Sequence, residues 1–72
     1  MPVMYKGHSL LPLAVGESGA YGAMVIVKFP SGRRWVSGIL GHFQDADDAC
    51  SFAVKCGEAY VDKKRLPYPP TD

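Results

Sequence analysis

The chain lacks several features that would point directly to a function. It has 72 residues, only two cysteines and a formal net charge of +1, and no apolar run approaches the roughly 20 residues that span a bilayer. The balanced charge favours neither nucleic acid nor acidic membranes as a general partner. The first residues lack a basic stretch followed by an apolar core and a cleavage site, so we expect no signal peptide and a cytoplasmic protein.

The two cysteines are spaced in a way that excludes a bond between them. Cys50 and Cys56 lie in a segment whose apolar residues recur with helical spacing. On a helix they would be about 9 Å apart along the axis and on different sides, whereas a disulfide needs Cα atoms within about 7 Å. We therefore expect two free thiols in a reducing compartment, with an intermolecular disulfide or a reactive thiol as the alternative.

Motifs for catalysis and for cofactor binding are also missing. The chain has no G-x-S-x-G sequence and no glycine loop of the type that holds phosphates. His8 and His42 could join the cysteines as metal ligands, but neither type of residue has the close spacing that orients ligands on one turn. Asp45, Asp47 and Asp48 are explained by the start of a helix. We expect no enzyme, no metal and no cofactor.

The segment from Ala23 to Phe29 is the most informative part of the chain. Successive residues of a strand point to opposite faces, and here both faces are apolar. One face carries Ala23, Val25, Val27 and Phe29, and the other carries Met24 and Ile26. One helix covers only one face of a small sheet, so the second face needs another partner. The nearest candidate is a second copy of the chain.

Three strands are expected, separated by two short turns. Their approximate ranges are 5–15, 21–29 and 33–40, and turn residues occupy 16–19 and 30–32. Short turns join antiparallel neighbours, so these strands form a meander. Pro12 cannot donate a hydrogen bond, which places the first strand at an edge or breaks it. In the third strand Trp35 shares a face with Ile39, and Val36 shares the other face with Leu40.

A helix is expected from about Asp45 to Lys64. Asp45 is a suitable N-cap, two aspartates follow in the first turn, and basic residues end the segment. Gly57 lies inside the helix and, with Ala49 and Ala53, forms a stripe of small residues. This stripe predicts close packing of the helix on the sheet or, alternatively, a tight contact between helices of an oligomer.

The expected fold class is α+β, a three-stranded antiparallel β-meander packed on one C-terminal α-helix (β-β-β-α). Residues 1–65 form a single domain, and residues 66–72 form a tail rich in proline. This tail is a frayed end or a segment that packs Leu66 and Tyr68 across a partner. If the two side chains instead fold over the sheet of their own chain, the protein is a monomer.

These observations favour a non-enzymatic domain that acts through protein–protein contacts and self-associates as a homodimer. The residues expected at that interface are Met24, Ile26, Val36 and Leu40. The alternative is nucleic-acid binding through Lys28, Arg33 and Arg34, which lie on or near one hairpin beside aromatic residues.

Part of the chain resembles a known family. Phe29-Pro30 ends the second expected strand, Gly32 follows, and the helix opens with Asp45-Ala46-Asp47-Asp48-Ala49. With Ala53 and Ala59, these residues are similar to the HicB-type antitoxin domain over about residues 21–62, and to small uncharacterised bacterial proteins built from a hairpin and a helix. The resemblance implies a bacterial protein that neutralises a toxin by direct contact. The chain differs in its short turn at residues 31–34 and in having no appended DNA-binding segment.

Overall fold

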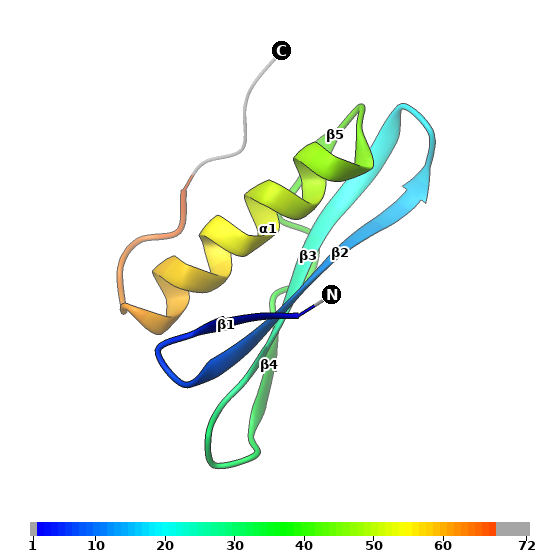
Figure 1. The fold of residues 1–72 in the computed structure, drawn as a ribbon. Helices are drawn as coiled ribbons and strands as arrows, with labels where there is room; N and C mark the ends of the chain where they lie inside the picture. Colours follow the sequence, from blue (N-terminus) through cyan, green and yellow to red (C-terminus); the bar gives the residue numbers. More distant parts are fainter. Residues whose placement is uncertain (1, 68–72) are drawn as a thin grey trace.

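The computed structural model describes residues 2–67 of the chain. One antiparallel sheet packs against a single helix, which lies along one face of the sheet (Figure 1). In chain order the elements are β1 Val3–Tyr5, β2 His8–Glu17, β3 Ala20–Lys28, β4 Arg34–Val36, β5 Gly41–Phe43 and α1 Ala46–Val61. The α+β class and the position of the helix after the strands are confirmed, but the sheet has more strands than the three expected.

The first expected strand is a hairpin. β1 and β2 pair antiparallel with Tyr5 opposite His8, so Lys6 and Gly7 alone form the turn. Their φ angles are 48° and 80°, and a two-residue type I′ turn requires positive φ at both positions. Lys has no special preference for positive φ, so Lys-Gly is a weaker turn signal than Asn-Gly. For this reason the sequence pattern predicts one strand where the structure has two.

β2 and β3 form the long central hairpin of the sheet. Their ladder runs from Ser9 opposite Lys28 to Glu17 opposite Ala20. The chain reverses through Ser18 and Gly19, as the turn cluster in the sequence predicts. This hairpin sets the long dimension of the molecule, whose extents are 36 × 23 × 16 Å.

Pro12 lies where β2 has a neighbour on one side only, because β1 pairs with β2 no further than Leu10. Pro12 is opposite Val25, and the amide and carbonyl of Val25 both bond to Ser37 on the far side of β3. In an antiparallel ladder the nitrogen of Pro12 then points away from β3, toward an edge without a described strand. Because the Pro12 nitrogen faces no described strand, the absence of its N–H leaves no hydrogen bond of the sheet unformed. This agrees with the expected edge position.

The third expected strand is divided into β4 and β5, which both pair with β3. Between them the amide of Ser37 donates to the carbonyl of Val25 (3.0 Å), and the amide of Leu40 donates to that of Ala23 (2.8 Å). Val36 is opposite Ile26 and Gly41 is opposite Ala23, so five steps along this segment match three steps along β3, and two extra residues are inserted as a bulge. Gly38, with φ of 74°, allows the detour.

The helix has the expected N-cap residue and ends slightly earlier than expected. Asp45 has extended backbone angles, although its side chain makes no capping hydrogen bond. At the other end Lys63 adopts a φ of 59°. The amides of Lys63 and Lys64 donate to the carbonyls of Tyr60 (3.1 Å) and Ala59 (2.8 Å). This Schellman motif ends α1 before the basic residues, which lie just beyond it.

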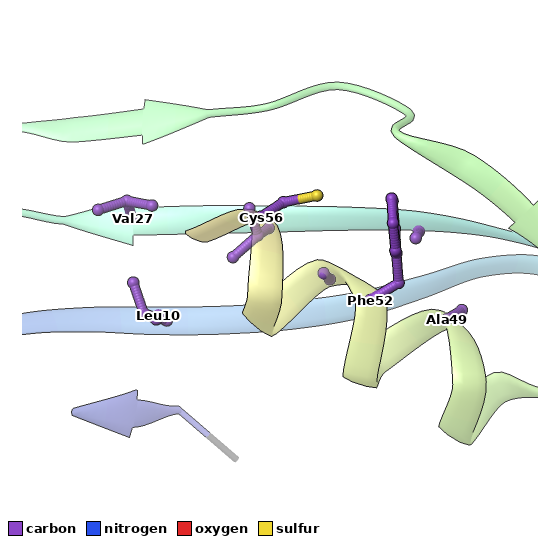
Figure 2. Close-up of a cluster of buried hydrophobic side chains, with 8 residues drawn as sticks. Leu10, Val27, Ala49, Phe52 and Cys56 are labelled. Atoms are coloured by element: carbon purple, nitrogen blue, oxygen red, sulfur yellow. The ribbon is translucent and has the colours of Figure 1, made fainter. Parts of the chain in front are cut away.

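Helix and sheet enclose a small apolar core (Figure 2). Its buried side chains are Leu10, Ala23, Val25 and Val27 from the sheet, and Ala49, Phe52, Ala53 and Cys56 from the helix. Gly57 is also buried, and a Cβ atom at this position would lie 3.2 Å from methyl carbons of Leu10 and Val25. The small-residue stripe thus serves close packing on the sheet, which confirms the first of its two interpretations.

Aromatic side chains extend the core toward the C-terminal end of α1. Trp35 stacks on Tyr60 with ring centroids 3.8 Å apart and planes within 4°. Phe29 meets Tyr60 edge to face at 6.1 Å. Trp35 therefore lies on the helix side, and the expectation that it shares a face with Ile39 is wrong, because Ile39 lies over Gly22 on the other side of the sheet. Leu66 also packs against this core, whereas Tyr68 is outside the described residues.

Candidate interaction surface

The side of the sheet opposite α1 carries a second set of apolar side chains, and we call it the open face. In β3 the buried residues alternate with Met24 and Ile26, so these two point away from the helix. Their partners in the ladder share this face, since directly opposed residues point the same way. The open face consists of Met4, Leu11, Leu13, Val15, Met24, Ile26, Val36 and Ile39.

Three of the four residues predicted for self-association lie together on the open face. Ile26 is directly opposite Val36, and Met24 is two positions away from Ile26 on the same strand. Leu40 does not join them, because it packs against the core on the helix side. Its expected place on this face is wrong.

The bulge explains why Leu40 and Ile39 exchange faces. Ile39 and Leu40 lie within the two-residue insertion, where strict alternation is lost, and alternation returns with the original parity in β5, where Gly41 is opposite Ala23. Ile39 accordingly lies over Gly22, where an added Cβ would be 3.0 Å from Cδ1 of Ile39. Gly22 has the same parity as Met24 in β3, which places Ile39 on the open face.

Sequence reasoning missed Leu11 and Leu13 as members of this surface. Alternation places Leu11 and Leu13 on one side of their strand, but nothing in the sequence pattern relates that side to the faces of the next strand. The ladder supplies this relation by placing Leu11 opposite Ile26 and Leu13 opposite Met24. The register, which depends on the turn at Ser18 and Gly19, was the missing information.

The two faces of the sheet differ strongly in exposure to solvent. Leu10, Val25 and Val27 on the helix side are 0% exposed, whereas Val36 is 54% and Ile39 is 51% exposed. Leu11, Leu13, Met24 and Ile26 are half-buried by their neighbours within the sheet. No described helix covers this face (Figure 1).

The three basic residues proposed to contact nucleic acid do not form one cluster. Lys28 and Arg34 are directly opposed in the ladder and line a depression together with Leu11 and Ile26. They therefore form a cationic rim at one end of the open face. Arg33 is separate from this rim, because its guanidinium lies 5.6 Å from the ring centroid of Phe29.

The histidines and cysteines are dispersed. His8 is edge to face with Phe29, and its Nδ1 donates to the carbonyl of Lys6 at 3.0 Å. His42 lies toward the other end of the sheet, opposite Gly22. Within residues 2–67, no three histidine, cysteine or acidic side chains come together as a metal-binding group. Both cysteines are free thiols, and burial raises the pKa of Cys56.

A polar cluster joins the end of α1 to the first hairpin. The Asp62 carboxylate accepts hydrogen bonds from the Lys6 ammonium and the Tyr5 hydroxyl, both at 2.6 Å. The bond from Lys6 and then the bond from Tyr5 hold the pKa of Asp62 below its ordinary value. The same bonds raise the pKa of Tyr5 and of Lys6. This cluster lies away from the open face and positions the β1–β2 turn.

Comparisons with known proteins give no further assignment: no family model, no curated protein and no solved structure matches the chain. Among the described residues, no helix is long and apolar enough to cross a membrane. The open face is therefore the feature from which a function is argued.

Proposed function

We propose that this protein is a small non-enzymatic domain that acts through protein–protein contacts and that its open face binds a second copy of the chain. The exposure of Val36 and Ile39, beside the half-buried Met24 and Ile26, carries the proposal. Contiguous apolar surface of this kind is typical of interaction sites.

The occupant we propose is a second copy, because the surface suits a two-fold interface. Such an interface uses the same patch twice, and an apolar face formed by two long strands is complementary to itself. Two sheets packed face to face would form a sandwich with one helix on each outer side.

Energetics also favour association. A domain of this length buries a small core, and oligomerisation is one of the usual ways in which small domains gain stability. Full burial of a Met or Ile side chain is worth about 1.5–3 kcal/mol. Residues such as Met24, Ile26 and Val36 therefore contribute enough to decide between monomer and dimer.

The test is the mass of the protein in solution, measured by light scattering across a dilution series. We expect a dimer for the parent chain and a folded monomer for the variant Met24→Lys with Ile26→Lys. In the dimer, two lysines on the open face would lose their hydration without gaining charged partners. The free-energy cost of this desolvation exceeds the gain from the apolar contacts. Far-ultraviolet circular dichroism of the variant establishes that the fold is retained.

The matched control compares single lysines on the two sides of the molecule. Ser51 is exposed on α1, so Ser51→Lys adds the same charge as Met24→Lys at a position remote from the open face. We expect Ser51→Lys to remain dimeric and Met24→Lys to dissociate at concentrations where the parent does not. A monomeric parent at all concentrations would disprove the proposed function.

Nucleic-acid binding, in a regulatory protein similar to the HicB-type antitoxins, is the second candidate. It is favoured by the direct opposition of Lys28 and Arg34, which places two cations side by side on the sheet. Its test is fluorescence anisotropy with a labelled single-stranded oligonucleotide at two salt concentrations. If this candidate holds, affinity falls steeply with salt and is lost in Arg33→Glu with Arg34→Glu. If the parent does not bind, the candidate is discarded.

A further inference from the structure

Charged side chains are distributed unevenly along the sheet. The turns β1–β2 and β3–β4 and the end of α1 lie at one end of the molecule, and the β2–β3 turn and the start of α1 lie at the other (Figure 1). We call these the basic end and the acidic end. The basic end carries Lys6, Lys28, Arg33, Arg34, Lys63, Lys64 and Arg65, and the acidic end carries Glu17, Asp45, Asp47 and Asp48. Glu58 and Asp62 offset only part of the positive charge of the basic end.

The same separation is present on the open face itself. Lys28 and Arg34 lie at one end of the β2–β3 ladder. Glu17 is at the other end of this ladder. Its position in β2 has the same parity as Leu11 and Leu13, so it lies on the same face. Apart from Met4 in β1, the apolar residues of the open face lie between these charges.

Two copies that meet through this face have two simple arrangements. A two-fold axis within the interface and parallel to the strands places basic end on basic end and acidic end on acidic end. An axis across the strands reverses one copy, so that each basic end meets the acidic end of its partner. Like charges held together at an interface are unfavourable, so charge complementarity favours the second arrangement.

We propose that the two copies pack antiparallel, with Glu17 of each protomer facing Lys28 and Arg34 of the other. This inference rests on the proposed self-association and specifies its geometry. The centre of the surface follows from the register: Leu13 is halfway between Ser9 and Glu17, and Met24 is halfway between Ala20 and Lys28. Leu13 and Met24 are paired, so the two-fold axis passes over this pair and Met24 meets its own copy.

The arrangement has a consequence for the basic rim. In the dimer Lys28 and Arg34 are covered and paired with a carboxylate, so they are no longer available to phosphate groups. Only Arg33, which lies over Phe29, stays outside the interface. Self-association and nucleic-acid binding through Lys28 and Arg34 therefore exclude each other.

Charge reversal tests the pairing. At low salt we expect Glu17→Lys to weaken the dimer about tenfold, because attraction becomes repulsion at both ends of the interface. Adding Lys28→Glu and Arg34→Glu to this variant reverses both partners, and we expect the affinity to return to near the parent value. Dissociation constants come from sedimentation equilibrium at two salt concentrations.

A distance between labels tests the orientation independently of affinity. Ser18 is exposed in the β2–β3 turn at the acidic end, outside the strand positions that form the open face, and a nitroxide on Ser18→Cys marks that end of each protomer. The half-buried Cys50 is replaced by alanine, and Cys56 is buried. In the antiparallel dimer the two labelled backbones are about 34 Å apart, because Ser18 lies five positions from the axis at Leu13 in each copy. In the parallel dimer they are about 10 Å apart.

The outcomes separate this inference from the proposed function. A dimer that Met24→Lys dissociates but whose affinity Glu17→Lys leaves unchanged would retain self-association and overturn the antiparallel pairing. A short distance between the labels would overturn it as well, as would failure of the triple variant to recover affinity. A parent chain that stays monomeric would overturn both. Recovery in the triple variant together with the long distance supports both.

Discussion

The two faces of the sheet are made by the same strands, yet only one of them has a partner within the described chain. On the helix side Leu10 and Val25 are completely buried beneath α1. On the open face their neighbours Leu11 and Ile26 are only half-buried. The two faces therefore have similar apolar patterns in the sequence, and they differ only in what packs against them. An apolar pattern indicates that a face is to be buried, and it does not state by which molecule.

The largest expected difference between the faces comes from truncating adjacent leucines. Leu10→Ala removes a fully buried side chain from the core, and we expect a loss of about 2–5 kcal/mol in the free energy of unfolding. Leu11→Ala should change this free energy much less and should weaken the dimer instead. Urea denaturation and a dilution series on both variants make the comparison. Equal unfolding effects would contradict the distinction between the two faces.

A smaller effect is expected where the helix approaches the sheet most closely. Gly57→Val would place a branched side chain against methyl carbons of Leu10 and Val25 that are 3.2 Å from the first added atom. We expect destabilisation of about 1–3 kcal/mol, measured by thermal unfolding at fixed protein concentration. Gly57→Ala is the milder control, because its better helix propensity offsets part of the crowding. Unchanged stability in Gly57→Val would show that the helix packs differently.

The polar cluster at the end of α1 predicts a pH-dependent effect away from both faces. The pKa of Asp62 is lowered, so its contribution is present above about pH 4 and is lost as the pH falls through its folded value. The pKa values of Lys6 and Tyr5 are raised, so their contribution is present below about pH 10 and is lost at higher pH.

Asp62→Asn tests this dependence. We expect the variant to be less stable than the parent at neutral pH, by less than for the Leu10 variant, and the two curves to converge at acidic and at alkaline pH. Melting temperatures across the pH range provide the measurement, and Glu58→Gln is the control on the same turn. A constant difference at every pH would contradict the charged interaction.

The smallest perturbation is a chemical probe of the core. Cys56 is fully buried and its pKa is raised by burial, whereas Cys50 is half-buried. We expect a thiol reagent to modify Cys50 in the native protein and to reach Cys56 only when the helix separates from the sheet. In Cys50→Ala the rapid modification that arises from Cys50 should disappear. Fast modification of Cys56 in that variant would mean that the core opens readily.

Much of the fold could be predicted because local signals and packing agree. The segment Ala23–Phe29 is almost entirely apolar and predicts a strand, and the helix has an N-cap aspartate and a small-residue stripe that meets the sheet. Two features were not fixed by the sequence, because each depends on a single residue in an unusual conformation. Lys6 adopts positive φ in the first turn, and Gly38 allows the bulge in the third strand.

The candidate site shows the same limit. Met24, Ile26 and Val36 could be placed together by counting parity along regular strands. Leu40 could not, because it lies within the bulge, where alternation is lost, and the sequence around Gly38 does not fix where the two extra residues are inserted. Leu11 and Leu13 required the register between strands, which is a property of the folded hairpin.

The measurement that tests the central claim most directly is a search for contacts between two differently labelled copies of the chain. One copy carries protonated methyl groups in Met and Ile within a deuterated background, and the other is isotopically distinct. The account predicts nuclear Overhauser effects between copies that involve Met24 and Ile26, and none that involve Leu10 or Val25. Two results would contradict this account. One is that contacts between copies arise only from the helix side, and the other is that no contacts between copies are seen at concentrations well above those of the dilution series.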